Sequence, residues 1–181
     1  EVMGKSAKAI GRVEGEGGLV AKNTIEVAGR QLVGNRIVLA TGSYAKTLPG
    51  LDIAGKIMTS DQALFLDHVP ARVIVLGGGV IGVEFASVFK SFGSEVTIIE
   101  ALPRLVAAED EAISKQLERS FRKRKISFQT GVKFAGATQS GDVVQVSLET
   151  GETIDADLRP VAVGGGPVPA RLGYEEARGP V

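Results

Sequence analysis

The chain has 181 residues, 44% of them apolar, enough for one complete domain or one domain and part of another. Its 21 basic and 21 acidic residues balance, so nucleic acid is not the expected partner. The absence of cysteine excludes a disulfide framework, a thiolate metal site and a cysteine redox centre from this chain. No apolar run reaches the roughly 18 residues that span a bilayer, and no signal peptide opens the sequence, so we expect no membrane association and a cytoplasmic location.

The first part of the chain, residues 1–58, predicts β-structure. Residues 18–27 (GLVAKNTIEV) predict two short strands around a tight turn, and Gly29 predicts another turn. Residues 31–39 (QLVGNRIVL) predict a buried strand that ends at residues 40–43, ATGS. We therefore expect a small β-rich N-terminal segment.

A short helix is predicted next. Ser60 is the expected N-cap. The expected apolar side of this helix comprises Ala63, Leu64 and Phe65. His68, the single histidine, follows in a loop without metal-ligand spacing around it, so no metal site is predicted.

Strands and helices then alternate. Residues 72–77 predict a buried strand, and residues 80–92 predict a helix with apolar residues at helical spacing. The next strand is expected at residues 95–100, an amphipathic helix at 109–124 and a third short strand at 126–129. This order predicts a parallel sheet with right-handed crossovers.

A β-meander and a returning strand complete the pattern. The meander is expected at residues 132–138, 143–149 and 152–155, and a buried strand at residues 158–163. The predicted fold class is therefore α/β: a Rossmann-like open parallel sheet with an antiparallel β-meander insert, plus the small β-rich N-terminal segment. The predicted domains are residues 1–58, 59–165 and 166–181.

Three glycines at the end of the first buried strand fit a dinucleotide-binding fingerprint. Gly77-x-Gly79-x-x-Gly82 follows a predicted strand and opens a predicted helix, which is the context the fingerprint requires. Gly77 permits a tight turn, Gly79 lets a pyrophosphate approach the backbone, and Gly82 lets the helix pack closely on the sheet. The helix N-terminus then offers unpaired N–H groups and a partial positive charge to the phosphates.

An acid at the expected distance supports this interpretation. Glu100 ends the next predicted strand, and a carboxylate there can accept hydrogen bonds from both ribose hydroxyls of adenosine and would repel a 2′-phosphate. Arg104 is close, but the acid itself favours NAD over NADP. The alternative is a glycine-rich turn that binds nothing. Strand, helix, spacing and acid together favour the nucleotide.

Several motifs resemble one family beyond the generic fold. GGGVIGVE at 77–84, GSEVTIIEALPRL at 93–105 and VAVGGGPV at 161–168, with IVLATGS at 37–43 upstream, resemble the flavoprotein disulfide reductases that bind both FAD and a pyridine nucleotide. Among them, dihydrolipoamide dehydrogenase is the most similar. The resemblance runs from about residue 9 to residue 176. It makes residues 59–165 the NAD-binding domain, residues 1–58 part of an FAD domain, and residues 166–181 the start of the return to that domain.

The resemblance also implies which residues contact the cofactors. Around the pyrophosphate and the nicotinamide ribose of NAD, they are Gly77, Gly78, Gly79, Val80, Ile81, Gly82, Val83 and Glu84. Glu100 would hold the adenine ribose, Phe134 would lie near the adenine, and Gly164 would close over the nicotinamide side. Thr41, Gly42 and Ser43 would contact FAD.

The complete enzymes of this family transfer electrons from dihydrolipoamide through a cysteine pair and FAD to NAD. The resemblance implies lipoyl domains of 2-oxoacid dehydrogenase complexes as partners, together with a second copy in a homodimer. This chain has no cysteine pair and no acid–base histidine of that kind, so no catalytic residue is predicted in it. Two alternatives stay open: a stand-alone NAD(H)-binding or nucleotide-binding module, and the NAD domain of another flavoprotein reductase.

Several positions depart from the family pattern. Arg159 and Pro160 stand where the family has apolar strand residues, and proline is unfavourable in a central strand, so we expect the last strand to be disturbed there. Gly165 stands where the family usually has arginine.

Overall fold

The computed structural model describes residues 11–48, 51–141, 143–167, 172 and 173. The chain divides into two compact units, one formed by Glu1–Ser43 with Pro167–Val181 and the other by Tyr44–Gly166. The predicted domain boundaries at residues 58 and 165 stay a prediction about the complete protein.

The first unit contains a three-stranded antiparallel sheet. Its strands, in the order β1-β2-β3, are β1 (Gly17–Ala21), β2 (Thr24–Val27) and β3 (Arg30–Val33). Ala28 and Gly29 connect β2 to β3 with positive φ angles of 50° and 73°, the left-handed geometry that matches the twist of a two-residue hairpin. The two strands and both turns predicted for residues 18–29 are confirmed.

The buried strand predicted at residues 31–39 is wrong. The ladder ends at Val33, and residues 34–42 form no strand. Val38 and Leu39 are 86% and 42% exposed. An apolar run becomes a buried strand only where neighbouring strands pair with it, and no described strand pairs with these residues.

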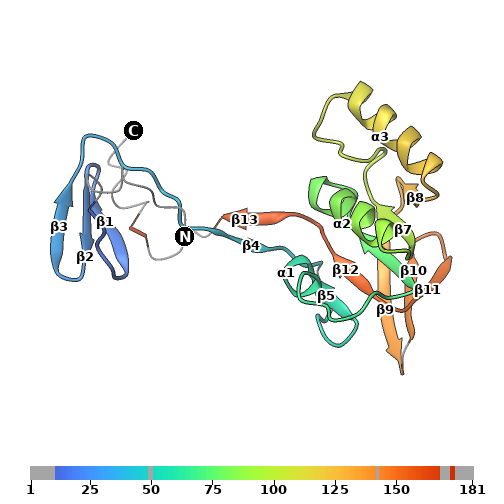
Figure 1. The fold of residues 1–181 in the computed structure, drawn as a ribbon. Coiled ribbons are helices and arrows are strands. Elements are labelled where there is room, and N and C mark those ends of the chain that lie inside the picture. The colour runs from blue at the N-terminus through green and yellow to red at the C-terminus, as the bar shows by residue number, and fades with distance from the viewer. Residues whose placement is uncertain (1–10, 49–50, 142, 168–171, 174–181) are drawn as a thin grey trace. The chain divides into compact units, whose positions relative to one another are not determined.

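The second unit is built on a five-stranded parallel sheet (Figure 1). Its order is β5-β12-β6-β7-β8, with β5 (Ile57–Thr59), β12 (Arg159–Val161), β6 (Arg72–Leu76), β7 (Glu95–Glu100) and β8 (Ser127–Thr130). The helices are α1 (Ser60–Ala63), α2 (Val80–Ser91) and α3 (Glu111–Lys123). The antiparallel meander comprises β9 (Phe134–Ser140), β10 (Val143–Leu148) and β11 (Thr153–Ala156). β4 (Ser43–Ala45) pairs with β13 (Gly165–Pro167) in a two-stranded sheet.

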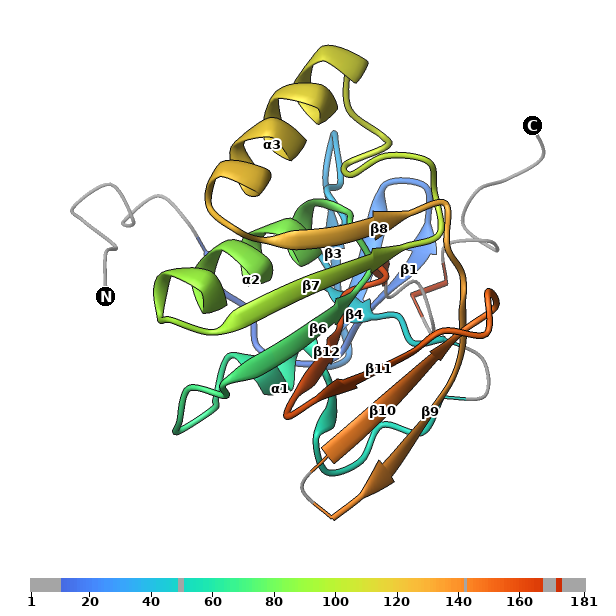
Figure 2. The same cartoon turned by 90° about the vertical axis from the view of Figure 1, so that its right-hand side faces the viewer.

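Both faces of the parallel sheet are covered. Alternate residues of β6 enter different cores: Val73 and Val75 pack with the helices, and Ile74 and Leu76 pack with the meander. Figure 2 shows α2 and α3 on one side of the sheet and β9–β11 on the other. The predicted α/β class with a parallel sheet and an antiparallel meander insert is confirmed. No helix in the described part of the chain is long and apolar enough to cross a membrane.

The short helix α1 begins one residue earlier than predicted. Thr59, not Ser60, is the N-cap: its hydroxyl accepts from the Gln62 N–H, while the Gln62 side chain accepts from the Thr59 N–H at 2.9 Å. The helix ends after Ala63, so Leu64 and Phe65 do not continue its buried side and are 71% and 87% exposed.

The last strand forms despite its proline. Leu158 and Ala162 donate to the carbonyls of Arg72 and Leu76 on β6, at 3.2 and 2.8 Å, and flank Pro160 in the ladder. Pro160 has no N–H to donate between them. Asp157 anchors the start of this strand by accepting from both the backbone N–H and the guanidinium of Arg72, at 2.9 and 2.7 Å. The Arg72 hydrogen bond lowers the pKa of the Asp157 carboxyl.

Candidate functional site

A cleft of about 590 Å³ lies in the second unit, at the carboxyl ends of β6, β7 and β12. Predicted site residues in its lining are Gly77, Gly79, Val80, Ile81, Glu100, Phe134 and Gly164. Residues far apart in the sequence meet here because parallel strands end at one edge of their sheet.

Each fingerprint glycine meets a different steric demand. Gly77 has φ 102°, and a Cβ there would lie 2.5 Å from the Ala162 carbonyl oxygen of the neighbouring strand. A Cβ on Gly82 would lie 1.9 Å from the Gly77 carbonyl oxygen, so α2 contacts the turn only because Gly82 has no side chain. A Cβ on Gly79 would meet no protein atom within 4 Å, because this residue faces the cleft.

The N-terminus of α2 faces the same cleft without a side-chain cap. The N-cap is Gly79, which has no side chain to cap the helix. The first hydrogen bond of the helix runs from the Val83 N–H to the Gly79 carbonyl at 3.0 Å. The N–H groups of Val80 and Ile81 therefore precede the hydrogen-bonded ladder of the helix. Both residues line the cleft, which places the partial positive charge of the helix end beside it.

The carboxylate of Glu100 is fixed by two backbone donors. One oxygen accepts from the Gly78 N–H at 2.5 Å, and the other accepts from the Leu102 N–H at 2.7 Å. An ionised carboxylate has about four acceptor positions, so each oxygen retains capacity for a further donor. A Cβ on Gly78 would lie 2.6 Å from a methyl carbon of Leu105 and 3.1 Å from the Glu100 carboxylate, so this position also excludes a side chain.

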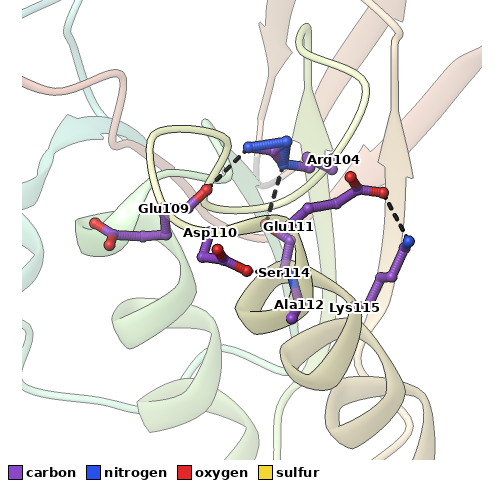
Figure 3. Close-up of polar contacts among 7 residues, drawn as sticks. All are labelled: Arg104, Glu109, Asp110, Glu111, Ala112, Ser114 and Lys115. Atoms are coloured by element: carbon purple, nitrogen blue, oxygen red, sulfur yellow. Dashed lines mark hydrogen bonds and ion pairs between the residues drawn. The ribbon is translucent and has the colours of Figure 1, made fainter.

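The Arg104 side chain bonds to the residues at the start of α3 (Figure 3). Its guanidinium donates to the carbonyl oxygens of Ala107 and Glu109 at 2.7 and 2.9 Å and to the Ser114 hydroxyl at 3.2 Å. Arg104 does not line the cleft. Among the described residues, no arginine lines the cleft to offer a charge to a phosphate on the adenosine ribose.

The remaining predicted site residues lie outside the cleft lining. Gly82 and Val83 are buried against the sheet. Glu84 is exposed on α2 and has no hydrogen-bond or ion-pair partner among the described residues. The residues predicted to contact FAD, Thr41, Gly42 and Ser43, are exposed members of the first unit, and Gly42 has φ 86°.

Other lining residues were missed by the sequence analysis. They are Leu48, Leu76, Ile99, Ala101, Leu102, Val132, Lys133, Ala162 and Val163. Several of them lie just after the carboxyl ends of β7, β8 and β12. The principle that placed Glu100 in the cleft, that parallel strands end at one edge of their sheet, applies to these residues as well. Lys133 adds a cation to the lining, 4.0 Å from the Glu149 carboxylate, with both side chains exposed.

Nothing in the described residues gathers three or more histidine, cysteine, aspartate or glutamate side chains as metal ligands. His68 pairs instead with its neighbour Asp67, whose carboxylate lies 2.7 Å from the ring nitrogen, with both side chains largely exposed. The hydrogen bond from His68 lowers the pKa of the Asp67 carboxyl.

Comparison with known proteins finds relatives in one family of oxidoreductases. Residues 2–179 match the family described as pyridine nucleotide-disulphide oxidoreductase. The chain is 40% identical over 153 residues to a dihydrolipoamide dehydrogenase of Chaetomium thermophilum, covering 81% of this chain and 30% of that protein. It is 41% identical over 127 residues to the dihydrolipoyl dehydrogenase of Bacillus subtilis, covering 68% of this chain and 27% of that protein. The chain thus spans about a third or less of the curated relatives' length.

Solved structures with a similar fold include a flavoprotein disulfide reductase. LpdA of Mycobacterium tuberculosis superposes with a TM-score of 0.77 at 25% identity, covering 92% of this chain and 39% of that one. The HOCl-induced flavoprotein disulfide reductase RclA of Escherichia coli superposes with a TM-score of 0.70 at 30% identity, covering 91% and 38%. Fold, cleft and relatives lead to one assignment: the chain belongs to the pyridine nucleotide-disulphide oxidoreductase family.

Proposed function

We propose that this chain is the NAD(H)-binding part of a flavoprotein oxidoreductase of the dihydrolipoamide dehydrogenase type. The named relatives, most of them dihydrolipoamide dehydrogenases, support this role. In this proposal residues 59–165 form the NAD domain, and residues 1–58 and 166–181 belong to an FAD domain that the chain shares with the rest of the complete enzyme.

One observation carries the proposal: Glu100 accepts a hydrogen bond from Gly78, the middle residue of the glycine turn. This bond fixes a carboxylate, which suits ribose hydroxyls, directly beside bare backbone, which suits a diphosphate. Both groups border one cleft of about 590 Å³, a volume within the range of pockets that hold organic ligands.

The residues present fit NAD. The diphosphate would lie against Gly79 and accept from the N–H groups of Val80 and Ile81, where the helix dipole favours negative charge. Glu100 would accept hydrogen bonds from the hydroxyls of the adenosine ribose, and it would repel the 2′-phosphate of NADP. Phe134 would border the adenine, and Gly164 would border the nicotinamide. When bound, the cofactor supplies hydride acceptance.

FAD binding is not proposed for this chain alone. Thr41, Gly42 and Ser43 offer one exposed turn in the first unit, and the sequence holds no second glycine fingerprint. The chain also has no cysteine to exchange electrons with a dithiol. The complete enzyme would oxidise dihydrolipoamide and reduce NAD, with lipoyl domains and a homodimer partner as its protein contacts. In this chain we assign no catalytic residue. The cytoplasmic location stays a prediction.

A second candidate function rests on the breadth of the relatives. They include a leghemoglobin reductase of Vigna unguiculata, 37% identical over 163 residues, and a ferredoxin reductase of Rhodopseudomonas palustris, 28% identical with a TM-score of 0.66. A flavoprotein reductase with another electron partner would use the same NAD cleft. A stand-alone NAD(H)-binding module would use it as well.

Titration of the chain with NADH, followed by cofactor fluorescence or calorimetry, tests the proposal. We expect saturable binding of NADH that is stronger than binding of NADPH. Glu100→Ala should weaken NADH binding by about 1–3 kcal/mol, the range for hydrogen bonds to a charged group. Glu95→Ala is the matched control, because Glu95 is an exposed acid at the opposite end of β7. Equal affinities of the two variants, or no binding by the wild type, would refute the proposal.

A further inference from the structure

The segment that joins β7 to α3, residues 101–110, forms neither helix nor strand, yet part of it is buried like a core. Leu105 is completely buried and belongs to the helix-side core, and Val106 is 6% exposed. The same segment contributes Ala101 and Leu102 to the lining of the cleft. Its conformation therefore affects the wall beside Glu100.

Arg104 holds this segment together from outside the cleft. Figure 3 shows its guanidinium reaching to Glu109 and Ser114 at the start of α3. Together with the Ala107 carbonyl, these groups give three acceptors within 3.2 Å. A cation is unfavourable beside a helix N-terminus, so helix electrostatics do not explain this position. The carbonyls of Ala107 and Glu109 and the hydroxyl of Ser114 explain it.

The segment in turn contacts the glycine turn. The Val106 N–H donates to the Gly78 carbonyl at 2.7 Å, and the Leu105 side chain packs where a Cβ of Gly78 would be. The Gly78 N–H is the donor that fixes Glu100. A continuous set of contacts therefore leads from Arg104 to the carboxylate that the proposed function assigns to ribose.

Val106 makes this arrangement costly without support. Its φ of 45° lies in the left-handed region, which a β-branched residue rarely adopts. Such conformations persist only where surrounding contacts over-determine them. On one side the Val106 N–H donates to the Gly78 carbonyl. On the other, the Val106 carbonyl accepts from the Glu109 N–H at 2.9 Å and from the Ser114 hydroxyl at 3.4 Å, and that hydroxyl also accepts from Arg104.

We propose that Arg104 is a positioning residue for the adenosine half of the NAD cleft: it holds residues 105 and 106 against Gly78 and so sets the position of the Glu100 carboxylate. Arg104 does this without touching the cofactor. The inference rests on the proposed function, because it assigns Glu100 to the adenosine ribose.

The test compares Arg104→Met with the wild-type chain in three measurements. NADH and ADP are titrated separately, because ADP carries the adenosine ribose and the diphosphate but no nicotinamide. Residue-resolved hydrogen exchange follows the amides of Gly78 and Val106. Arg119→Met is the matched control, since Arg119 is an exposed arginine on α3 without a partner among the described residues.

We expect Arg104→Met to weaken NADH and ADP by the same factor, about fivefold or more. Exchange at Gly78 and Val106 should accelerate while the core amides of β6 keep their protection. A merely structural role would reduce protection throughout the unit and leave the affinity of the folded protein unchanged. Arg119→Met should match the wild type within about twofold.

Two results overturn the inference while the proposed function stands: NADH binding by Arg104→Met as strong as that of the wild type, or equal weakening by Arg119→Met, which would show a general charge effect. Absence of NADH binding to the wild type overturns both. Should Arg104→Met not fold, Arg104→Lys replaces it. Lysine keeps the charge but lacks the planar fork that bonds several acceptors, so the same outcomes apply.

Discussion

Replacement of Gly79 by valine separates binding from folding at the centre of the cleft. Gly79 has φ −72° and ψ −176°, an extended conformation that any residue adopts. A Cβ at this position meets no protein atom within 4 Å. The loss of a favourable N-cap glycine is roughly offset by the lower entropy of the unfolded chain, so we expect the free energy of unfolding to change by less than about 1 kcal/mol.

Binding should respond very differently. The open space beside Gly79 belongs to the cleft, and a valine side chain would occupy the place where the diphosphate approaches the backbone. Loss of two charge-assisted hydrogen bonds from the α2 N–H groups costs about 3 kcal/mol or more. We therefore expect the Kd for NADH to rise by more than about a hundredfold. Calorimetric titration measures this change, and urea unfolding of the same sample measures stability.

The result that refutes this reasoning is specific. If Gly79→Val binds NADH with wild-type affinity and unfolds at the wild-type urea concentration, the diphosphate does not lie on this turn. If the variant unfolds far more easily, the space beside Gly79 is filled in solution, and the description of the cleft is wrong.

Three further predictions concern Gly82, Asp157 and the absence of cysteine. Gly82→Ala should destabilise the chain by about 1–3 kcal/mol in urea unfolding, because its Cβ would lie 1.9 Å from the Gly77 carbonyl oxygen; a stability equal to the wild type would contradict this close approach. Asp157→Asn should cost about 1 kcal/mol at neutral pH after solvent screening, because Arg72 lowers the pKa of Asp157. A lowered pKa contributes stability that is present above the unfolded value and is lost as the pH falls below about 4, so wild type and variant should converge in acid; a constant difference from pH 7 to strong acid would count against this pair. The chain alone, given dihydrolipoamide and NAD, should form no NADH in an absorbance assay, because it has no cysteine; turnover would show that this chain carries catalytic residues, which we do not assign to it.

Local periodicity predicted most of the second unit. The strands at residues 72–76 and 95–100 and the helix at residues 80–91 follow apolar spacing that is set within each segment, so sequence alone located them within a residue or two. The segment around Val38 failed for the opposite reason. Its apolar residues specify a strand only when other strands pair with it, and local spacing carries no information about such partners.

The cleft could be predicted in outline but not in its contacts. The spacing between the glycine turn and Glu100 places both at one sheet edge, and the structure brings them together. The direction of Arg104 was not predictable, because a long flexible side chain follows the carbonyl positions of an irregular segment. Leu102 and Val132 were missed because loop residues fold over the edge after their strands end.

Because of the proline in β12, we expect the two sides of the cleft to differ in stiffness. β7, which ends at Glu100, is hydrogen-bonded to a parallel strand along each flank. β12, which leads to Gly164, also lies between two parallel strands, but it has only three residues, and Pro160 withholds a donor from its ladder. Strand fluctuations are larger where fewer backbone hydrogen bonds resist them. A dinucleotide bound in this cleft would therefore be held rigidly at its adenosine end and less rigidly at its nicotinamide end. The nicotinamide ring could then shift toward an electron donor while the adenosine half stays bound.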